Sequence, residues 1–256
     1  MDDTVRRAER MVALMNERIR SRTPQERDRL MQQFLAQAMT PQQRFRAVGM
    51  LMNLGIALST RTGGSSNAGN AFLDLMNAVT ESVDAHALPY AIAGTIATGI
   101  HGEPRTSYTV EICLGVTLKQ AAKLADLLPS RFRCLREAMP EAASSWTKVH
   151  LIDIQTEMKI DLSVLSDDSY CDQVLRRRRR VEYSTGGMSF WIVSAEDVIL
   201  MKLLWRKGSG SQKQWDNALS VVRTRGASLD WKYLRHWAGR LGVSNDMEKL
   251  RDEGGV

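Results

Sequence analysis

Residues 93–114 read AGTIATGIHGEPRTSYTVEICL, and this stretch decides the fold. Its pattern predicts a short strand, a glycine turn at Gly94 and Thr95, a short helix, a polar loop that begins at His101, and a second strand. Side chains two residues apart on a strand point to the same face of a sheet, so Thr109 and Glu111 share a face. The stretch therefore predicts an α/β fold in which two strands are joined through a short helix.

The rest of the chain predicts further strands and helices. A first strand is expected at residues 90–93. Alternating apolar residues at 149–154 and 160–164 predict a hairpin with a turn near Thr156 and Glu157, and the glycines at 186 and 187 predict a short second pair of strands. Helical spacing predicts helices at 71–87 and 117–128, a helix through the arginine run 176–180, and three or four C-terminal helices, one of them capped by Ser194. A small mixed sheet with a C-terminal helical bundle is therefore expected.

Residues 1–62 are expected to form an N-terminal helical arm. Apolar residues recur at helical spacing between positions 5 and 19, which predicts a first helix. Two further helix starts, at Thr23 and Thr40, combine a capping hydroxyl, a proline at the first helical position and a Glu or Gln that can close a capping box. A Gly/Ser/Asn-rich linker is expected at 63–70, then a core at 71–166 and a mostly helical subdomain at 167–256.

The composition is that of an ordinary globular protein with a modest positive charge. Of its 256 residues, 43% are hydrophobic and 25% are charged, and the formal net charge is +6. No apolar run approaches the length that spans a bilayer, and the N-terminus lacks the apolar stretch of a signal peptide. The three cysteines have no C-x-x-C spacing, which argues against a disulfide framework or a structural zinc site and fits a reducing cytoplasm. The arginine run permits a polyanion partner, but a solvated face is the favoured interpretation.

The 93–114 stretch resembles the active-site strand pair of the nucleotidyltransferase superfamily, in the small bacterial branch that includes abortive-infection toxins and minimal nucleotidyltransferases. In that branch a glycine turn ends the first strand, the loop reads H-G-x-P-R-x-T, and the second strand carries two carboxylates as D-x-D or D-x-E. Glu111 occupies the second carboxylate position, whereas Thr109 occupies the first. The matching loop residues are His101, Gly102, Pro104, Arg105 and Ser107. The resemblance extends from about residue 87 to the C-terminus, and Asn217 stands where relatives usually place an aspartate.

The resemblance implies a magnesium-dependent site that lacks one ligand. Nucleotidyl transfer uses two metal ions held by carboxylates, which clamp the triphosphate and activate the attacking hydroxyl. The resemblance assigns Glu111 and Asp161 to metal binding and leaves Thr109 at the vacant first position. A hydroxyl is a neutral ligand, whereas Mg²⁺ prefers anionic oxygens, so metal binding and catalysis are expected to be impaired.

The resemblance also implies a site for a nucleoside triphosphate. Gly94 lets the backbone approach the phosphates, and Thr95 offers a hydroxyl and an amide at a helix start. His101 and Arg105 are candidates for nucleotide binding, although a lone loop histidine is more often structural and the arginine could instead brace a carboxylate. Lys202 either faces the triphosphate from its helix or is an exposed residue that balances nearby acids.

Three functions are compatible with these features. The first is a nucleotidyltransferase-fold protein of a toxin–antitoxin or phage-defence system with an impaired metal site, which binds a nucleotide, a nucleic acid or a protein partner. The second is an active transferase that moves NMP from an NTP to a hydroxyl of RNA, protein or a small molecule, by means of Glu111, Asp161 and a third ligand. The third is a non-catalytic assembly subunit that docks or self-associates through residues 1–62.

Overall fold

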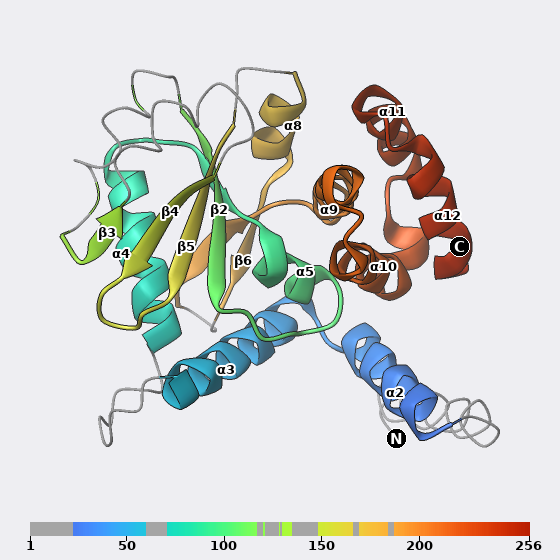
Figure 1. Cartoon of the computed structure of the whole chain (residues 1–256), viewed down its shortest axis with the longest axis horizontal. Coiled ribbons are helices and arrows are strands. Elements are labelled where there is room, and N and C mark those ends of the chain that lie inside the picture. Colours follow the sequence, from blue (N-terminus) through green and yellow to red (C-terminus); the bar gives the residue numbers. More distant parts are fainter. Residues whose placement is uncertain are drawn as a thin grey trace.

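A mixed β-sheet lies at the centre of the molecule and is flanked by helices (Figure 1). The computed structural model describes residues 23–59, 71–116, 120, 128, 130–134, 148–165, 169–183 and 187–256. Among these residues, seven strands lie in the order β3-β4-β5-β2-β1-β7-β6, with β2/β5 and β1/β7 parallel and the other neighbours antiparallel. The strands are β1 Tyr90–Ile92, β2 Thr109–Gly115, β3 Phe132–Cys134, β4 Lys148–Asp153, β5 Lys159–Leu165, β6 Arg179–Glu182 and β7 Ser189–Ile192. The predicted α/β fold with a mixed sheet is confirmed.

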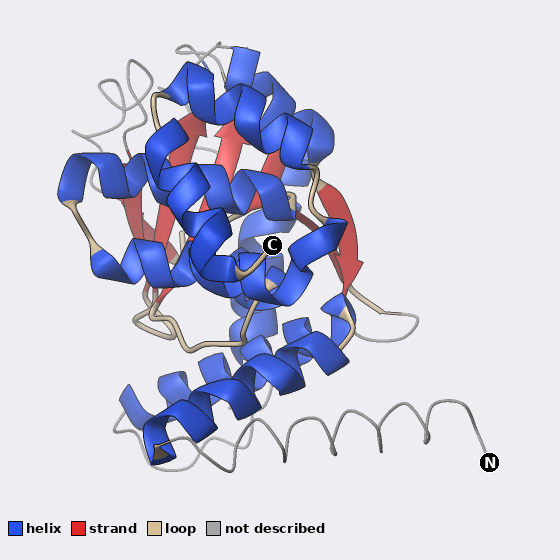
Figure 2. Ribbon diagram, turned by 90° about the vertical axis from the view of Figure 1, so that its right-hand side faces the viewer, coloured by secondary structure: helices blue, strands red, loops and turns tan. Residues whose placement is uncertain are grey.

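Helices pack around the sheet (Figure 1). They are α2 Pro24–Ala38, α3 Pro41–Ser59, α4 Ala71–Ala85, α5 Gly94–His101, α8 Ser169–Arg177, α9 Ala195–Ser209, α10 Gln212–Arg225, α11 Trp231–Leu241 and α12 Ser244–Gly254, with a 3-10 turn at Gly226–Ser228. In Figure 1, α3 crosses one end of the sheet and α9 to α12 stand together beside it. Figure 2 looks from the side of this helical layer, with the strands behind it. Of the helices in the described ranges, none combines the length and the apolar character needed to cross a bilayer.

One hydrophobic core joins α3 and α4 to the sheet. Phe45 of α3, Phe72 of α4 and Phe190 of β7 are all buried. The ring of Phe45 meets the other two edge to face, with centroids 6.4 Å from Phe72 and 5.8 Å from Phe190. Edge-to-face aromatic pairs add about 0.5–1.5 kcal/mol to the stabilisation that burial provides. α3 therefore belongs to the same core as the strands, whereas α2 contacts α10.

The helix starts follow the signals in the sequence. Both predicted capping boxes are formed: the hydroxyls of Thr23 and Thr40 accept hydrogen bonds from the amides of Glu26 and Gln43 at 3.3 and 3.2 Å. In return, the amides of both threonines donate to the side chains of Glu26 and Gln43. Ser194 caps α9, since its hydroxyl accepts a hydrogen bond of 3.1 Å from an amide of the first turn. These three predictions are confirmed.

Small differences concern element ends. α4 ends at Ala85 rather than at residue 87, because Ala87 has a φ of +53°, outside the right-handed helical region. β1 ends at Ile92, one residue earlier than predicted. The predicted hairpin at 149–164 is β4 and β5, and the C-terminal layer contains four helices within the described ranges. The helix predicted between positions 5 and 19 and the linker at 63–70 lie outside the described residues, as does the helix at 117–128 apart from residues 120 and 128.

The helix predicted through the arginine run is wrong in its second half. α8 ends at Arg177, and β6 begins at Arg179 and pairs with β7. The guanidinium groups of Arg178 and Arg180 lie over the ring of Trp191, at 4.6 and 5.4 Å from its centroid. Cation–π contacts of this kind favour the strand pairing that positions the ring. Tertiary contacts therefore override the helical propensity of the run.

Candidate functional site

Glu111 and Asp161 lie side by side on neighbouring strands. β2 and β5 are parallel, and Glu111 pairs directly with Asp161 in their register, so both side chains project from the same face of the sheet. Both residues are buried to the same degree, at 8% exposure. The structure thus brings together the two carboxylates that the family resemblance singles out.

The Glu111 carboxylate lies against the start of α5. Ala93 donates its amide to the backbone carbonyl of Glu111 at 2.8 Å, which fixes the chain just before the helix. Gly94 has a φ of +61°, and a Cβ atom on it would overlap the Glu111 carboxylate. Glycine is therefore required here for two reasons, the left-handed backbone and the close approach. The positive end of the helix dipole favours an anion at this place, and Thr95 lies beside it in the first turn.

Lys202 brings a buried cation to Glu111. It projects from α9, is only 2% exposed, and its Nζ lies 4.0 Å from Glu111 Oε1. The same Nζ is 4.7 Å from the ring centroid of Trp205. The interpretation of Lys202 as an exposed residue that balances nearby acids is therefore wrong, because its side chain is buried. The ammonium group faces the candidate site instead.

Asp161 is also in contact with basic side chains. Its Oδ1 is 2.7 Å from His150 Nδ1 and 3.4 Å from Lys159 Nζ. His150 lies on β4 directly across from Asp161, while Lys159 precedes Asp161 by two residues on β5. Sequence reasoning missed both contacts: a turn centred on Thr156 and Glu157 would pair His150 with Ser163, whereas the observed register pairs His150 with Asp161.

Thr109 stands at the first carboxylate position of the resemblance, at the beginning of β2. Its backbone is tied to Ser107, whose hydroxyl donates to the Thr109 carbonyl at 2.8 Å and accepts from the Thr109 amide at 3.1 Å. In the β2/β5 register its partner is Lys159, whose ammonium is directed to Asp161. A neutral hydroxyl and a lysine therefore occupy the part of the site where a further acid is expected.

These donors do not fit a pair of magnesium ions. In the described part of the chain, no three His, Cys, Asp or Glu side chains gather closely enough to hold a metal ion. Glu111 faces an ammonium group, and Asp161 contacts both an imidazole and an ammonium group. Mg²⁺ needs near-octahedral oxygen ligands with anionic character, and neighbouring cations oppose its approach. These side chains therefore do not form a two-metal site.

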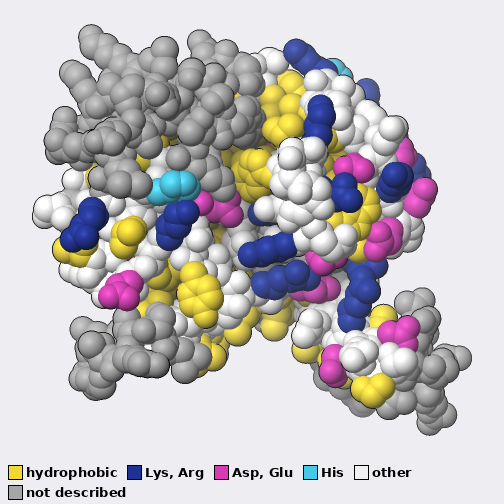
Figure 3. Space-filling model, in the orientation of Figure 1, with side chains coloured by type: hydrophobic (Ala, Val, Ile, Leu, Met, Phe, Trp, Pro, Cys, Tyr) yellow, Lys and Arg dark blue, Asp and Glu magenta, His cyan; other side chains and the backbone are white. Residues whose placement is uncertain are grey.

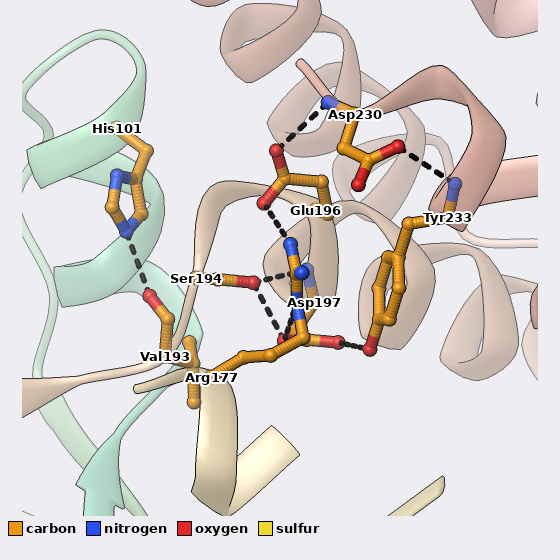
Figure 4. Close-up of polar contacts among 8 residues, drawn as sticks. All are labelled: His101, Arg177, Val193, Ser194, Glu196, Asp197, Asp230 and Tyr233. Atoms are coloured by element: carbon orange, nitrogen blue, oxygen red, sulfur yellow. Dashed lines mark hydrogen bonds and ion pairs between the residues drawn. The ribbon is translucent and has the colours of Figure 1, made fainter. Parts of the chain in front are cut away.

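His101 and Arg105 lie away from the two carboxylates. α5 separates Gly94 from His101, a rise of about 10 Å along the helix axis. His101 Nε2 is 2.7 Å from the carbonyl of Val193, the contact labelled in Figure 4. Arg105 donates to Glu103 Oε2 at 3.1 Å and to Asn217 Oδ1 at 3.4 Å. The structure does not bring either residue to Glu111.

The environment of His101 favours the neutral imidazole. Its Nδ1 is buried and has no hydrogen-bond partner among the residues that the structure describes. Burial lowers the pKa of His101 to about 4, and the hydrogen bond to Val193 offsets this only in part. His101 thus packs the strand-to-helix connection between β7 and α9 onto the end of α5.

A buried polar network holds the helical layer together (Figure 4). Asp197 on α9 accepts hydrogen bonds from the hydroxyls of Ser194 at 2.6 Å and Tyr233 at 2.7 Å. Arg177 of α8 lies 3.8 Å above the Tyr233 ring and donates to Glu196 at 3.0 Å. Burial raises the pKa of Asp197, and the two hydroxyl donors counteract that increase only in part. This network joins α8, α9 and α11 and was not predicted, since its members come from distant parts of the sequence.

The comparisons with known proteins concern the fold. The sequence matches no protein-family model and no curated protein. The solution structure of the antibiotic-resistance factor ANT(2'')-Ia is similar, with a TM-score of 0.50 and 10% identity, over 70% of this chain and 98% of that one. A nucleotidyltransferase-like protein from Paracoccidioides brasiliensis has a TM-score of 0.42 and 16% identity, over 70% of this chain and 91% of that one.

A crystal structure of ANT(2'')-Ia in complex with adenylyl-2''-tobramycin has a TM-score of 0.47 and 12% identity, over 65% of this chain and 95% of that one. At such low identity these likenesses concern the fold alone, and only the first is close enough to support an argument. The chain therefore has a nucleotidyltransferase-like fold, as the 93–114 stretch predicts.

Proposed function

We propose that this nucleotidyltransferase-fold protein does not transfer nucleotides and acts by binding. The observation that supports the proposal is the contact between the buried ammonium of Lys202 and the carboxylate of Glu111, 4.0 Å apart. It means that a protein cation already neutralises the acid that a metal ion would need.

The charges of the site support the same conclusion. Two carboxylates, Glu111 and Asp161, face two lysine ammonium groups, Lys202 and Lys159, so these four groups have no net charge. A divalent cation is attracted to a site with surplus negative charge, and the hydroxyl of Thr109 adds none. The proposed function therefore does not include phosphoryl transfer, because the balanced charges of the site do not favour the metal ions that would stabilise the transferring group.

The proposed ligand is a nucleoside triphosphate that binds without a metal ion. The start of α5 and the Lys202 ammonium both favour an anion, and the Glu111 carboxylate now fills that position. A phosphate group, which carries more charge, would displace this carboxylate and use the same two donors. A toxin–antitoxin or phage-defence role is part of the proposal and rests on the family resemblance of residues 93–114.

Two measurements test this proposal. Calorimetric titration with ATP and GTP should detect binding that is unchanged by Mn²⁺ or by a chelator. Incubation with α-labelled NTPs, Mg²⁺ or Mn²⁺, and total RNA or cell lysate should label no acceptor. Transfer of label by the wild-type protein would contradict the proposal and favour the active transferase.

Variants of the site make the test sharper. Thr109→Asp alone restores one acid but leaves Lys202 opposite Glu111, so it should gain little Mn²⁺ affinity. The double variant Thr109→Asp/Lys202→Met has surplus negative charge and should bind Mn²⁺ measurably. Thr106→Asp/Lys202→Met adds the same charge at an exposed loop position and serves as the matched control. Equal Mn²⁺ binding by the wild-type protein and the first double variant would show that Lys202 does not block the site.

A further inference from the structure

A cavity of about 230 Å³ lies between α2, the loop that follows α5, and α10. It is separate from the Glu111 site, since its loop residues follow the C-terminal end of α5 and Glu111 lies at the N-terminal end. In Figure 3, basic and acidic side chains gather where the lobe that contains α2 meets the body of the molecule. The cavity is therefore lined by charged groups rather than by an apolar surface.

Three arginines reach this cavity from three different elements. Arg29 comes from α2, Arg105 from the loop after α5, and Arg223 from α10. Arg105 is held in place by hydrogen bonds to Glu103 and Asn217, which orient its planar guanidinium group. Convergent guanidinium groups are the usual protein partners of phosphate, because each one presents several donors in a fixed plane.

Arg223 and Arg29 differ in how far their charges are already compensated. Arg223 is largely buried and lies 3.5 Å from Glu253, a residue outside the cavity lining. Arg29 is exposed, and no ion pair of Arg29 is found within the described ranges. Its charge is thus available to a ligand at the mouth of the cavity.

The acidic residues of the cavity limit the size of its ligand. Glu103 and Asp216 also line it, so three guanidinium groups and two carboxylates leave a net charge of +1. A long polyanion would bring more negative charge than this surface compensates and would be repelled by the two carboxylates. The volume is below the 300–1,000 Å³ of most drug-sized ligand pockets, which favours a small ligand.

We propose that this cavity binds a small phosphate monoester. The phosphate is held by Arg29, Arg105 and Arg223, and hydroxyl groups of the esterified portion donate to Glu103 or Asp216. The ligand needs two or more negative charges to compete with the carboxylates for the guanidinium groups, which distinguishes a phosphate from a simple carboxylate. This site does not depend on the nucleotide proposed for the Glu111 site.

The test uses inorganic phosphate as the probe with the full chain, without metal ions or nucleotides. Isothermal titration at constant ionic strength should detect phosphate binding, and acetate at the same ionic strength should give no comparable heat. Arg29→Gln, an exposed change that leaves the core untouched, should weaken phosphate binding about tenfold. Arg235→Gln removes an exposed arginine on α11 and should leave it unchanged.

A pair of glutamine variants provides the matched control. Gln32 lines the cavity, whereas Gln25 is an exposed residue of the same helix outside the lining. Gln32→Glu should weaken phosphate binding at least tenfold, and Gln25→Glu, which adds the same charge to α2, should change it less than twofold. Phosphate binding that is insensitive to both Arg29→Gln and Gln32→Glu would place the ion elsewhere, for example at the start of α5, and would overturn the proposal. Equal affinity for acetate would overturn the assignment of a phosphate ester.

Discussion

Acidification should weaken the fold through His101. Burial lowers the pKa of this imidazole to about 4, because a proton on the unpartnered Nδ1 would place a cation in the protein interior. In the unfolded chain a histidine has a pKa near 6.5, so the unfolded state takes up a proton between pH 6.5 and 4 while the native state does not. The stabilisation from neutral His101 is therefore complete above about pH 6.5 and is lost as the pH falls toward 4.

The size of the effect follows from the two pKa values. A pKa difference of about 2.5 between the unfolded and native states corresponds to about 3 kcal/mol of unfolding free energy. About half of this loss should be reached near pH 5.3. The loss would be a large part of the total stability of a typical domain, which is about 5–15 kcal/mol.

The variant His101→Gln isolates this contribution. A glutamine Nε2–H can still donate to the Val193 carbonyl, but the side chain does not titrate. Urea unfolding followed by tryptophan fluorescence, at several pH values from about 7.5 to 4.5, should give a smaller pH dependence for the variant than for the wild-type protein. Subtracting the pH dependence of the variant from that of the wild-type protein cancels the contributions of the other titratable groups, including Asp197. Because the native pKa of Asp197 is raised, that residue makes acidification favour the native state.

An exposed histidine provides the control for this experiment. His236→Gln changes an exposed histidine on α11 and should leave the pH dependence of unfolding as in the wild-type protein. If His101→Gln lost as much unfolding free energy on acidification as the wild-type protein, the reasoning from the buried Nδ1 would be refuted.

Three other substitutions, and a control at Tyr108, have expected effects on the free energy of unfolding. Tyr233→Phe removes the 2.7 Å hydrogen bond to the buried Asp197 and should lower the free energy of unfolding, measured in urea, by about 1.5–3 kcal/mol. The control Tyr108→Phe changes a ring that is 65% exposed and should lower it by less than about 0.5 kcal/mol. Gly94→Ala should cost at least about 1–2 kcal/mol, because φ is +61° and the new methyl group would overlap a carboxylate; an unchanged Tm would contradict this. Gly208→Ala in α9 should instead raise Tm by about 2–4 °C, since among the described residues no atom beyond the adjacent backbone of its own helix lies within 4 Å of the added methyl group.

The strand and turn signals of the sequence were sufficient to predict the central elements of the fold. Gly94 marks the turn into α5, and the alternating residues on either side of Thr156 specify the β4–β5 hairpin. These signals are local: a positive φ, a capping hydroxyl and a period of two depend on a few neighbouring residues. Local patterns of this kind predicted most of the elements in the described ranges with errors at their ends, but they did not predict β3.

Elements that depend on distant partners could not be found in the same way. The arginine run has good helical propensity throughout, yet β6 begins at Arg179 because β7 is available as a partner and because Trp191 accepts two guanidinium groups. The Asp197 network similarly joins residues from α8, α9 and α11. Neither the pairing of strands nor the convergence of three helices has a signature within a short window of sequence.

The candidate site itself was predictable in its acids but not in its cations. The family resemblance alone singled out Thr109, Glu111 and Asp161, whereas the choice between the two interpretations of Lys202 depended on which face of α9 meets the sheet. A site with three carboxylates carries a surplus of negative charge that divalent ions relieve, while two carboxylates opposite two ammonium groups are balanced already. With a neutral hydroxyl at Thr109, the buried ammonium of Lys202 therefore leaves no surplus negative charge in the site. Restoring the acid alone leaves that ammonium in place, so recovery of metal binding should require both changes together.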